Sequence, residues 1–153
     1  MPPPRLLVVH HSPAPSLEAM LEAVLDGTGA DGIQGVEVVV RPALEAGVDD
    51  VLAAAAYVLG TPANLGYMSG ALKHFFDTVY EPCLDHTTGR PYGLYLHGRT
   101  DTEGARLGVE KITTGLGWRL AQPVVSSLGP VDDAARDRCW ELGAAMAAGL
   151  TLT

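Results

Sequence analysis

Lysine and arginine are scarce in this sequence. It has 10 of them against 18 aspartates and glutamates, a formal net charge of −8 at pH 7. A nucleic-acid backbone and an anionic membrane surface both attract basic faces, so the charge argues against both partners. Between Arg5 and Arg41 there is no lysine or arginine. An anion bound by that segment would therefore be held by backbone amides and hydroxyl groups.

Cysteine is rare as well. Cys83 and Cys139 lie far apart and form no CxxC or Cys/His framework, which is typical of a reducing compartment and not of a disulfide scaffold. The residues before His10 leave no room for a signal peptide or a membrane span. We therefore expect a cytoplasmic protein.

The composition is that of a folded chain. Hydrophobic residues make up 47% of the 153 residues, which is enough for a packed core. There is no internal repeat, and no low-complexity tract beyond the prolines at 2–4. We expect a single domain over residues 1–153.

Apolar runs alternate with helical patterns five times. Short, wholly apolar runs indicate strands buried on both faces, and the alternation indicates parallel strands joined by crossover helices. The expected fold is α/β, a doubly wound five-stranded parallel sheet of order 2-1-3-4-5 with helices on both faces. We expect strands at 6–9, 36–40, 56–59, 92–97 and 123–127, and helices at about 15–25, after 47, and at 68–82, 102–116 and 132–150.

Three loops follow the first, third and fourth of these strands, at residues 12–16, 61–67 and 97–102. In the expected strand order their carboxyl ends converge where the order reverses, which is where such sheets bind ligands. The sequence therefore predicts one site built from three loops.

The residues of the first loop allow two interpretations. Ser12, Ser16 and the free amides of a helix start can hold a phosphate group, aided by the helix dipole. The alternative is that Ser16 is a helix cap.

The second loop has the residues that a flat, polar-edged ligand needs. Gly66 lets the backbone approach such a ligand, and Asn64 can form hydrogen bonds with its edge. Tyr67 can stack on the ligand or form one side of the site. The alternative is an ordinary connection between a strand and a helix.

The stretch from Gly60 to Asp77 reads GTPANLGYMSGALKHFFD. It resembles the flavodoxin-like NAD(P)H:FMN and quinone oxidoreductases, whose segment after the third strand reads roughly G-[ST]-P-x-x-x-G-x-M-[SA]-x-x-[LM]-K-x-F-x-D. The resemblance implies a flavodoxin-like fold with bound FMN. It places the FMN phosphate at Ser12 and Ser16. It places the ring between two sets of residues: Thr61, Pro62, Ala63, Asn64, Gly66 and Tyr67 on one side, and His97, Gly98 and Asp101 on the other.

The same resemblance implies NAD(P)H as the electron donor and a small acceptor such as a quinone or flavin, with a homodimer as a further expectation. Since the cofactor performs the chemistry, we assign no catalytic residue. Two alternatives stay open. One is a flavodoxin-type electron carrier that docks on a redox partner protein. The other is an FMN-free binding module, because Pro13 and Pro15 remove amide donors from the first loop.

Other residues suggest competing sites. Arg99 is a candidate for a nicotinamide phosphate or a substrate anion, or else is a surface charge. Cys83 and Arg90 resemble a phosphatase loop, but the spacer is one residue too long and contains Asp85. The neighbours His10 and His11 point to opposite faces of an extended strand, so we expect no metal site, and one of them to line the flavin pocket or pack within its rim.

Overall fold

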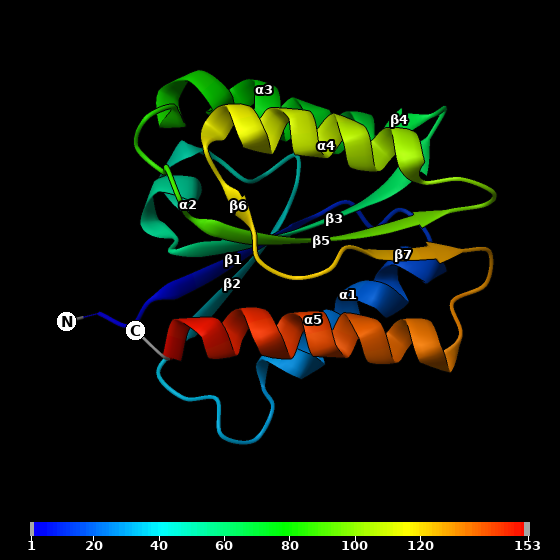
Figure 1. Ribbon diagram of the computed structural model, residues 1–153, viewed down its shortest axis with the longest axis horizontal. Coiled ribbons are helices and arrows are strands. Elements are labelled where there is room, and N and C mark those ends of the chain that lie inside the picture. The colour runs from blue at the N-terminus through cyan, green and yellow to red at the C-terminus, as the bar shows by residue number, and fades with distance from the viewer. Residues whose placement is uncertain (1, 152–153) are drawn as a thin grey trace.

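The computed structural model describes residues 2–151 as a mostly parallel sheet between two layers of helices (Figure 1). The strands alternate with helices along the chain, as the apolar runs predict. The elements are β1 (Arg5–His10), α1 (Pro15–Thr28), β2 (Glu37–Pro42), α2 (Val48–Ala53), β3 (Ala56–Asn64), β4 (Tyr67–Met68), α3 (Gly70–Cys83), β5 (Pro91–Gly98), α4 (Glu103–Leu116), β6 (Arg119–Leu120), β7 (Val125–Leu128) and α5 (Asp133–Thr151).

The strand order confirms the predicted doubly wound sheet. It runs β2-β1-β3-β5, and β6 and β7 both pair in parallel with β5. The predicted fifth strand is thus two short pieces. Pro123 lies in the gap between them, and a proline has no N–H to donate to a ladder.

Alternate residues of the strands form two cores. Leu7 and Val9 of β1 are fully buried against α2, α3 and α4, while Leu6 and Val8 are fully buried against α1 and α5. Figure 1 shows these two helix layers on opposite sides of the sheet. Burial on both faces explains why the strand sequences are apolar throughout instead of alternating.

The third strand is longer than predicted. It runs to Asn64, and β4 returns antiparallel to it, with Asn64 opposite Tyr67. The prediction of a loop over residues 61–67 was therefore wrong for all but its tip. Pro62 is tolerated in β3 because β1 ends opposite Gly60, which leaves Pro62 with a parallel neighbour on the β5 side only.

Candidate functional site

A cleft of about 710 Å³ lies at the carboxyl ends of β1, β3 and β5. This is the point where the strand order reverses, and the volume is in the range of sites for small molecules and cofactors. All three predicted loops contribute to it, together with the first turn of α4. The lining residues are Pro13, Ala14, Leu17, Pro62, Ala63, Asn64, Leu65, Gly66, His97, Gly98, Arg99, Thr100, Asp101, Gly104 and Ala105.

The turn between β3 and β4 forms one wall of this cleft. Leu65 and Gly66 have φ values of +50° and +78°, as the two central residues of a type I′ hairpin turn require. The Gly66 carbonyl packs so closely on Gly104 of α4 that a Cβ there would overlap it, and the ring of Tyr67 packs in the same way on Gly108. The two glycines of α4 thus allow the turn to pack closely against this helix. The Leu65 side chain is fully exposed at its tip.

Thr61 and Tyr67, two of the predicted ring contacts, are not among the lining residues. The fully buried Thr61 hydroxyl oxygen accepts a hydrogen bond from the Ser69 amide at 3.0 Å. Ser69 in turn caps α3 by accepting from the Leu72 amide at 3.2 Å. Thr61 therefore fixes the start of α3, and Tyr67 covers α4. Pro62, Ala63, Asn64 and Gly66 do line the cleft.

The third loop forms the opposite wall and is fixed at both ends. The His97 ring is hydrogen-bonded through Nε2 to the Gly129 carbonyl at 2.5 Å, and the Gly129 amide donates to the Gly98 carbonyl at 2.9 Å. The Asp101 carboxylate accepts from the Glu103 amide at 2.8 Å, at the positive end of α4. His97, Gly98 and Asp101 all line the cleft, as predicted for a ligand-binding loop.

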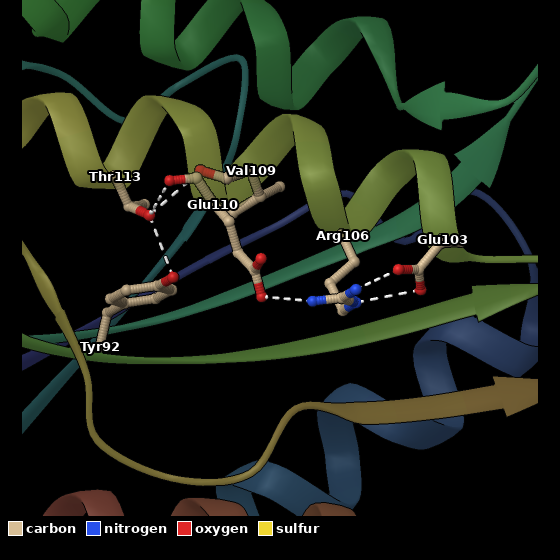
Figure 2. A network of polar contacts seen from close by, with 6 residues as sticks. All are labelled: Tyr92, Glu103, Arg106, Val109, Glu110 and Thr113. Carbon is tan, nitrogen blue, oxygen red and sulfur yellow. Dashed lines mark hydrogen bonds and ion pairs between the residues drawn. The ribbon is translucent and has the colours of Figure 1, made fainter.

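Only one arginine or lysine in the described part of the chain lines the cleft. It is the exposed Arg99, and no ion pair holds its guanidinium. Arg106 lies on α4 close by in sequence, but Figure 2 shows its guanidinium held between the carboxylates of Glu103 and Glu110. The hydrogen bond from Arg106 lowers the pKa of Glu103. Arg99 is therefore the basic side chain available to an anionic ligand.

The first loop contributes Pro13 and Ala14 to the cleft, and Leu17 of α1 follows them, whereas the predicted contacts Ser12 and Ser16 are not among the lining residues. The N-cap of α1 is Ala14, with no side-chain hydrogen bond, so the alternative of a Ser16 cap was wrong. Pro15 takes the first helical position, where a missing N–H matters least. The next amides, those of Ser16 and Leu17, have no partner within the helix and remain available to a ligand.

The two histidines at the end of β1 differ in their surroundings. The His10 ring is hydrogen-bonded through Nδ1 to the Ser12 hydroxyl at 2.8 Å. Burial, and then the neighbouring His11, lower the pKa of His10. The Nδ1 atom of His11 is buried and has no hydrogen-bond partner among residues 2–151.

Several lining residues were missed by the sequence reasoning. Leu65, Thr100 and the two residues of α4, Gly104 and Ala105, were not predicted as ligand contacts. Leu65 and Thr100 lie inside predicted loops and could have been included for that reason. Gly104 and Ala105 carry no such signal, because only the docking of the hairpin turn on α4 brings them to the cleft.

Cys83 and Arg90 do not form a phosphatase-like site in the structure. The Arg90 guanidinium donates to the carbonyls of Leu52 and Ala54, at 3.0 and 2.7 Å, so it closes the end of α2 and does not face a phosphate. Cys83 is fully buried. Among residues 2–151 no three His, Cys, Asp or Glu side chains gather as they would around a metal ion. No helix there combines the length and apolar character needed to cross a bilayer.

The sheet order, the two helix layers and the cleft at the switch point define a flavodoxin-like α/β fold. An archaeal flavodoxin superposes with a TM-score of 0.81 at 20% identity, over 96% of this chain and 99% of that one. A WrbA-like flavodoxin from Agrobacterium tumefaciens superposes with a TM-score of 0.77 at 17% identity, over 97% and 98%. At such identities the likeness establishes the fold.

Sequence comparison adds one relative. A flavodoxin from Aquifex aeolicus (strain VF5) is 35% identical over 75 residues. The match takes in 49% of this chain and 40% of the relative's length. No protein-family model matches the chain.

Proposed function

We propose that this protein binds FMN in the cleft and passes hydride or electrons between NAD(P)H and a small acceptor such as a quinone or a flavin. The observation that carries the proposal is that the hallmark segment, Gly60 to Asp77, supplies one wall of a cleft at the switch point of the sheet. FMN is the cofactor that the resemblance of this segment implies, and two of the proteins similar to this chain are flavodoxins. A cytoplasmic location and a homodimer remain predictions from the sequence.

The ring side of the cleft fits a flavin. Pro62 and Ala63 offer apolar contact, and Asn64 offers an amide at the same wall. A Cβ at Gly66 would meet nothing within 4 Å, so the backbone there is open to a flat ligand. His97 to Asp101 close the other side, and their hydrogen bonds to Gly129 and Glu103 keep that wall in place.

The phosphate side fits a monophosphate. The uncapped amides of Ser16 and Leu17 and the positive end of α1 favour an anion. Ser12 and Ser16 stand on either side of residues 13–15 in the sequence and remain the predicted hydroxyl donors. Since no lysine or arginine occurs between Arg5 and Arg41, the loop lacks the basic side chain that a nucleoside triphosphate needs.

FMN, when bound, supplies the hydride and electron chemistry. The chain's own residues orient the cofactor and exclude water from one side of it. Arg99, at the rim, would attract an anionic group of the electron donor. No side chain of the cleft is placed as a general acid or base in this account.

A flavodoxin-type electron carrier is the second candidate. The names of the relatives favour it, and so does the net charge of −8, which suits docking on a basic redox partner. In that case the protein has no small-molecule acceptor of its own.

Turnover separates the two candidates. The full chain, loaded with FMN, is mixed with NADH or NADPH, with and without a quinone, and the oxidation of the nicotinamide is followed by absorbance. We expect oxidation that depends on the protein. If neither nucleotide is oxidised although FMN is bound, the oxidoreductase proposal fails and the carrier remains. Arg99→Gln is expected to raise KM for the nucleotide about tenfold, as the loss of one charge-assisted hydrogen bond predicts.

A further inference from the structure

His10 and Ser12 form a polar pair where β1 ends and the first loop begins. His10 is the last residue of β1 and lies on the same face of the sheet as Leu6 and Val8. Its Nδ1 atom is 2.8 Å from the Ser12 hydroxyl oxygen. Ser12 immediately precedes Pro13 and Ala14, which line the cleft. The pair therefore connects the buried end of β1 to the loop expected to hold a phosphate.

A third polar group lies in the same row of the sheet. His10 is opposite Gly60 on β3, and Gly60 is opposite Tyr95 on β5. A Cβ at Gly60 would overlap the phenol ring of Tyr95, so this ring extends from β5 across β3, towards the strand that ends at His10. The Tyr95 hydroxyl is buried and has no hydrogen-bond partner among residues 2–151. Burial raises the pKa of Tyr95 well above its usual range, so the phenol keeps its proton as a donor.

We propose that His10 is a positioning residue that donates a hydrogen bond from Nδ1 to Ser12, which leaves the Ser12 hydroxyl proton free for the phosphate group of a flavin monophosphate. The inference rests on the proposed function. A phosphate dianion accepts hydrogen bonds and donates none, so Ser12 helps to bind it only as a donor. Were Ser12 to donate to His10 instead, its oxygen lone pairs would face the anion.

The composition of the loop makes this donor important. Pro13 and Pro15 have no N–H, and no lysine or arginine occurs between Arg5 and Arg41. The amides of Ser16 and Leu17 and the serine hydroxyls are then the main donors of the turn. Since the Tyr95 hydroxyl has no hydrogen-bond partner among residues 2–151, the contact with Ser12 is the interaction that decides which His10 nitrogen carries the proton.

The test compares FMN with riboflavin, which has the ring but not the phosphate. Affinities of the full chain for both are measured by quenching of flavin fluorescence. His10→Leu is expected to weaken FMN about tenfold and riboflavin by less than about twofold, because one hydrogen bond to the anion is lost. His10→Asn has an amide nitrogen near the Nδ1 position and is expected to restore FMN affinity to within about threefold of the parent.

Ser12→Ala should show the same selective loss as His10→Leu, and the double variant should lose no more, since the two residues act as a unit. His11→Leu, which removes a neighbouring ring whose Nδ1 atom has no hydrogen-bond partner among residues 2–151, is the matched control and should not change the ratio of FMN to riboflavin affinity. If His10→Leu does not fold, His10→Gln replaces it, because its amide reaches the Nε2 position instead.

Equal losses of FMN and riboflavin in the His10 variants would mean a merely structural role and would overturn the inference. An unchanged ratio in His10→Leu would overturn it too. If the parent protein binds neither flavin, the proposed function itself fails. If it binds both equally well, only the phosphate assignment, and with it the role of His10, fails.

Discussion

Gly60 shows how one absent side chain shapes both the core and the site. The hallmark segment begins at this glycine, yet the reason for glycine here is the neighbouring strand. The ring of Tyr95 occupies the space where a Cβ would be. The sequence shows a glycine after an apolar run, but the partner that requires it is 35 residues away and is visible only in the folded sheet.

Gly60→Ala is expected to lower the free energy of unfolding by about 1–3 kcal/mol, because the methyl group would displace a fully buried ring. Urea denaturation of the flavin-free protein measures this. Gly149→Ala on the exposed side of α5, where nothing lies within 4 Å, is the control and should be neutral or slightly stabilising. A Gly60→Ala protein as stable as the parent would show that Tyr95 has room to move.

Leu65 is the opposite case, because a large side chain occupies a turn position where glycine or asparagine would be less strained. Its φ of +50° is unfavourable for a leucine, and the side chain gains no burial in return. Leu65→Asn should therefore stabilise the protein by about 0.5–1 kcal/mol, since asparagine suits this position of a type I′ turn. Leu44→Asn, also exposed but without a positive φ, should bring no such gain. Thermal unfolding of both variants is the measurement, and equal shifts would contradict the assignment of strain.

His10 makes a pH prediction. Burial lowers its pKa from the ordinary value of 6.5 in the folded protein. The unfolded chain then binds more protons between the two pKa values, so the free energy of unfolding falls as pH drops below about 6.5. His10→Asn should remove this part of the pH dependence between pH 5 and about 7.5, measured by urea titrations. The exposed His74→Asn is the control, and an identical pH profile for His10→Asn and the parent would contradict the prediction.

The elements show where sequence patterns suffice and where they do not. β1 and the helices α1 to α5 follow from local apolar runs and helical spacing, so their places could be predicted. β4 could not, because two residues have no pattern of their own and pair only through the turn at Leu65 and Gly66. β6 and β7 read as one strand because the break at Pro123 depends on which residues of β5 they face.

Thr61 of β3 is hydrogen-bonded to Ser69 at the start of α3, and replacing Thr61 tests this contact. Thr61→Val leaves the buried Ser69 amide without an acceptor, which should cost about 1–3 kcal/mol in unfolding free energy. Thr61→Ser keeps the acceptor and should cost less. Riboflavin affinity of the folded Val variant should change by less than about threefold, since the side chain does not line the cleft. A strong loss of riboflavin binding in a stable Thr61→Val protein would indicate that Thr61 does contact the flavin ring.

At the scale of the whole molecule, topology accounts for the position of the site. Three loops were predicted to converge because a doubly wound sheet reverses at one point, and the cleft lies there. Which side chains face into it could not be predicted in the same way. Thr61 and Tyr67 belong to the converging segments, yet a hydrogen bond from the Ser69 amide and packing on α4 decide where their side chains lie. Polar type and loop position alone do not distinguish a ligand contact from such a support.

The most direct test of the account is an FMN titration of the flavin-free full chain, followed by thermal unfolding. A cofactor that binds only the folded state should stabilise it by about 2.7 kcal/mol at 100 times its Kd. For a chain of this size that raises Tm by about 5–10 °C. We expect this rise, together with the yellow colour of bound flavin after gel filtration. No rise in Tm and no retained colour at millimolar FMN would contradict a flavin site in the cleft.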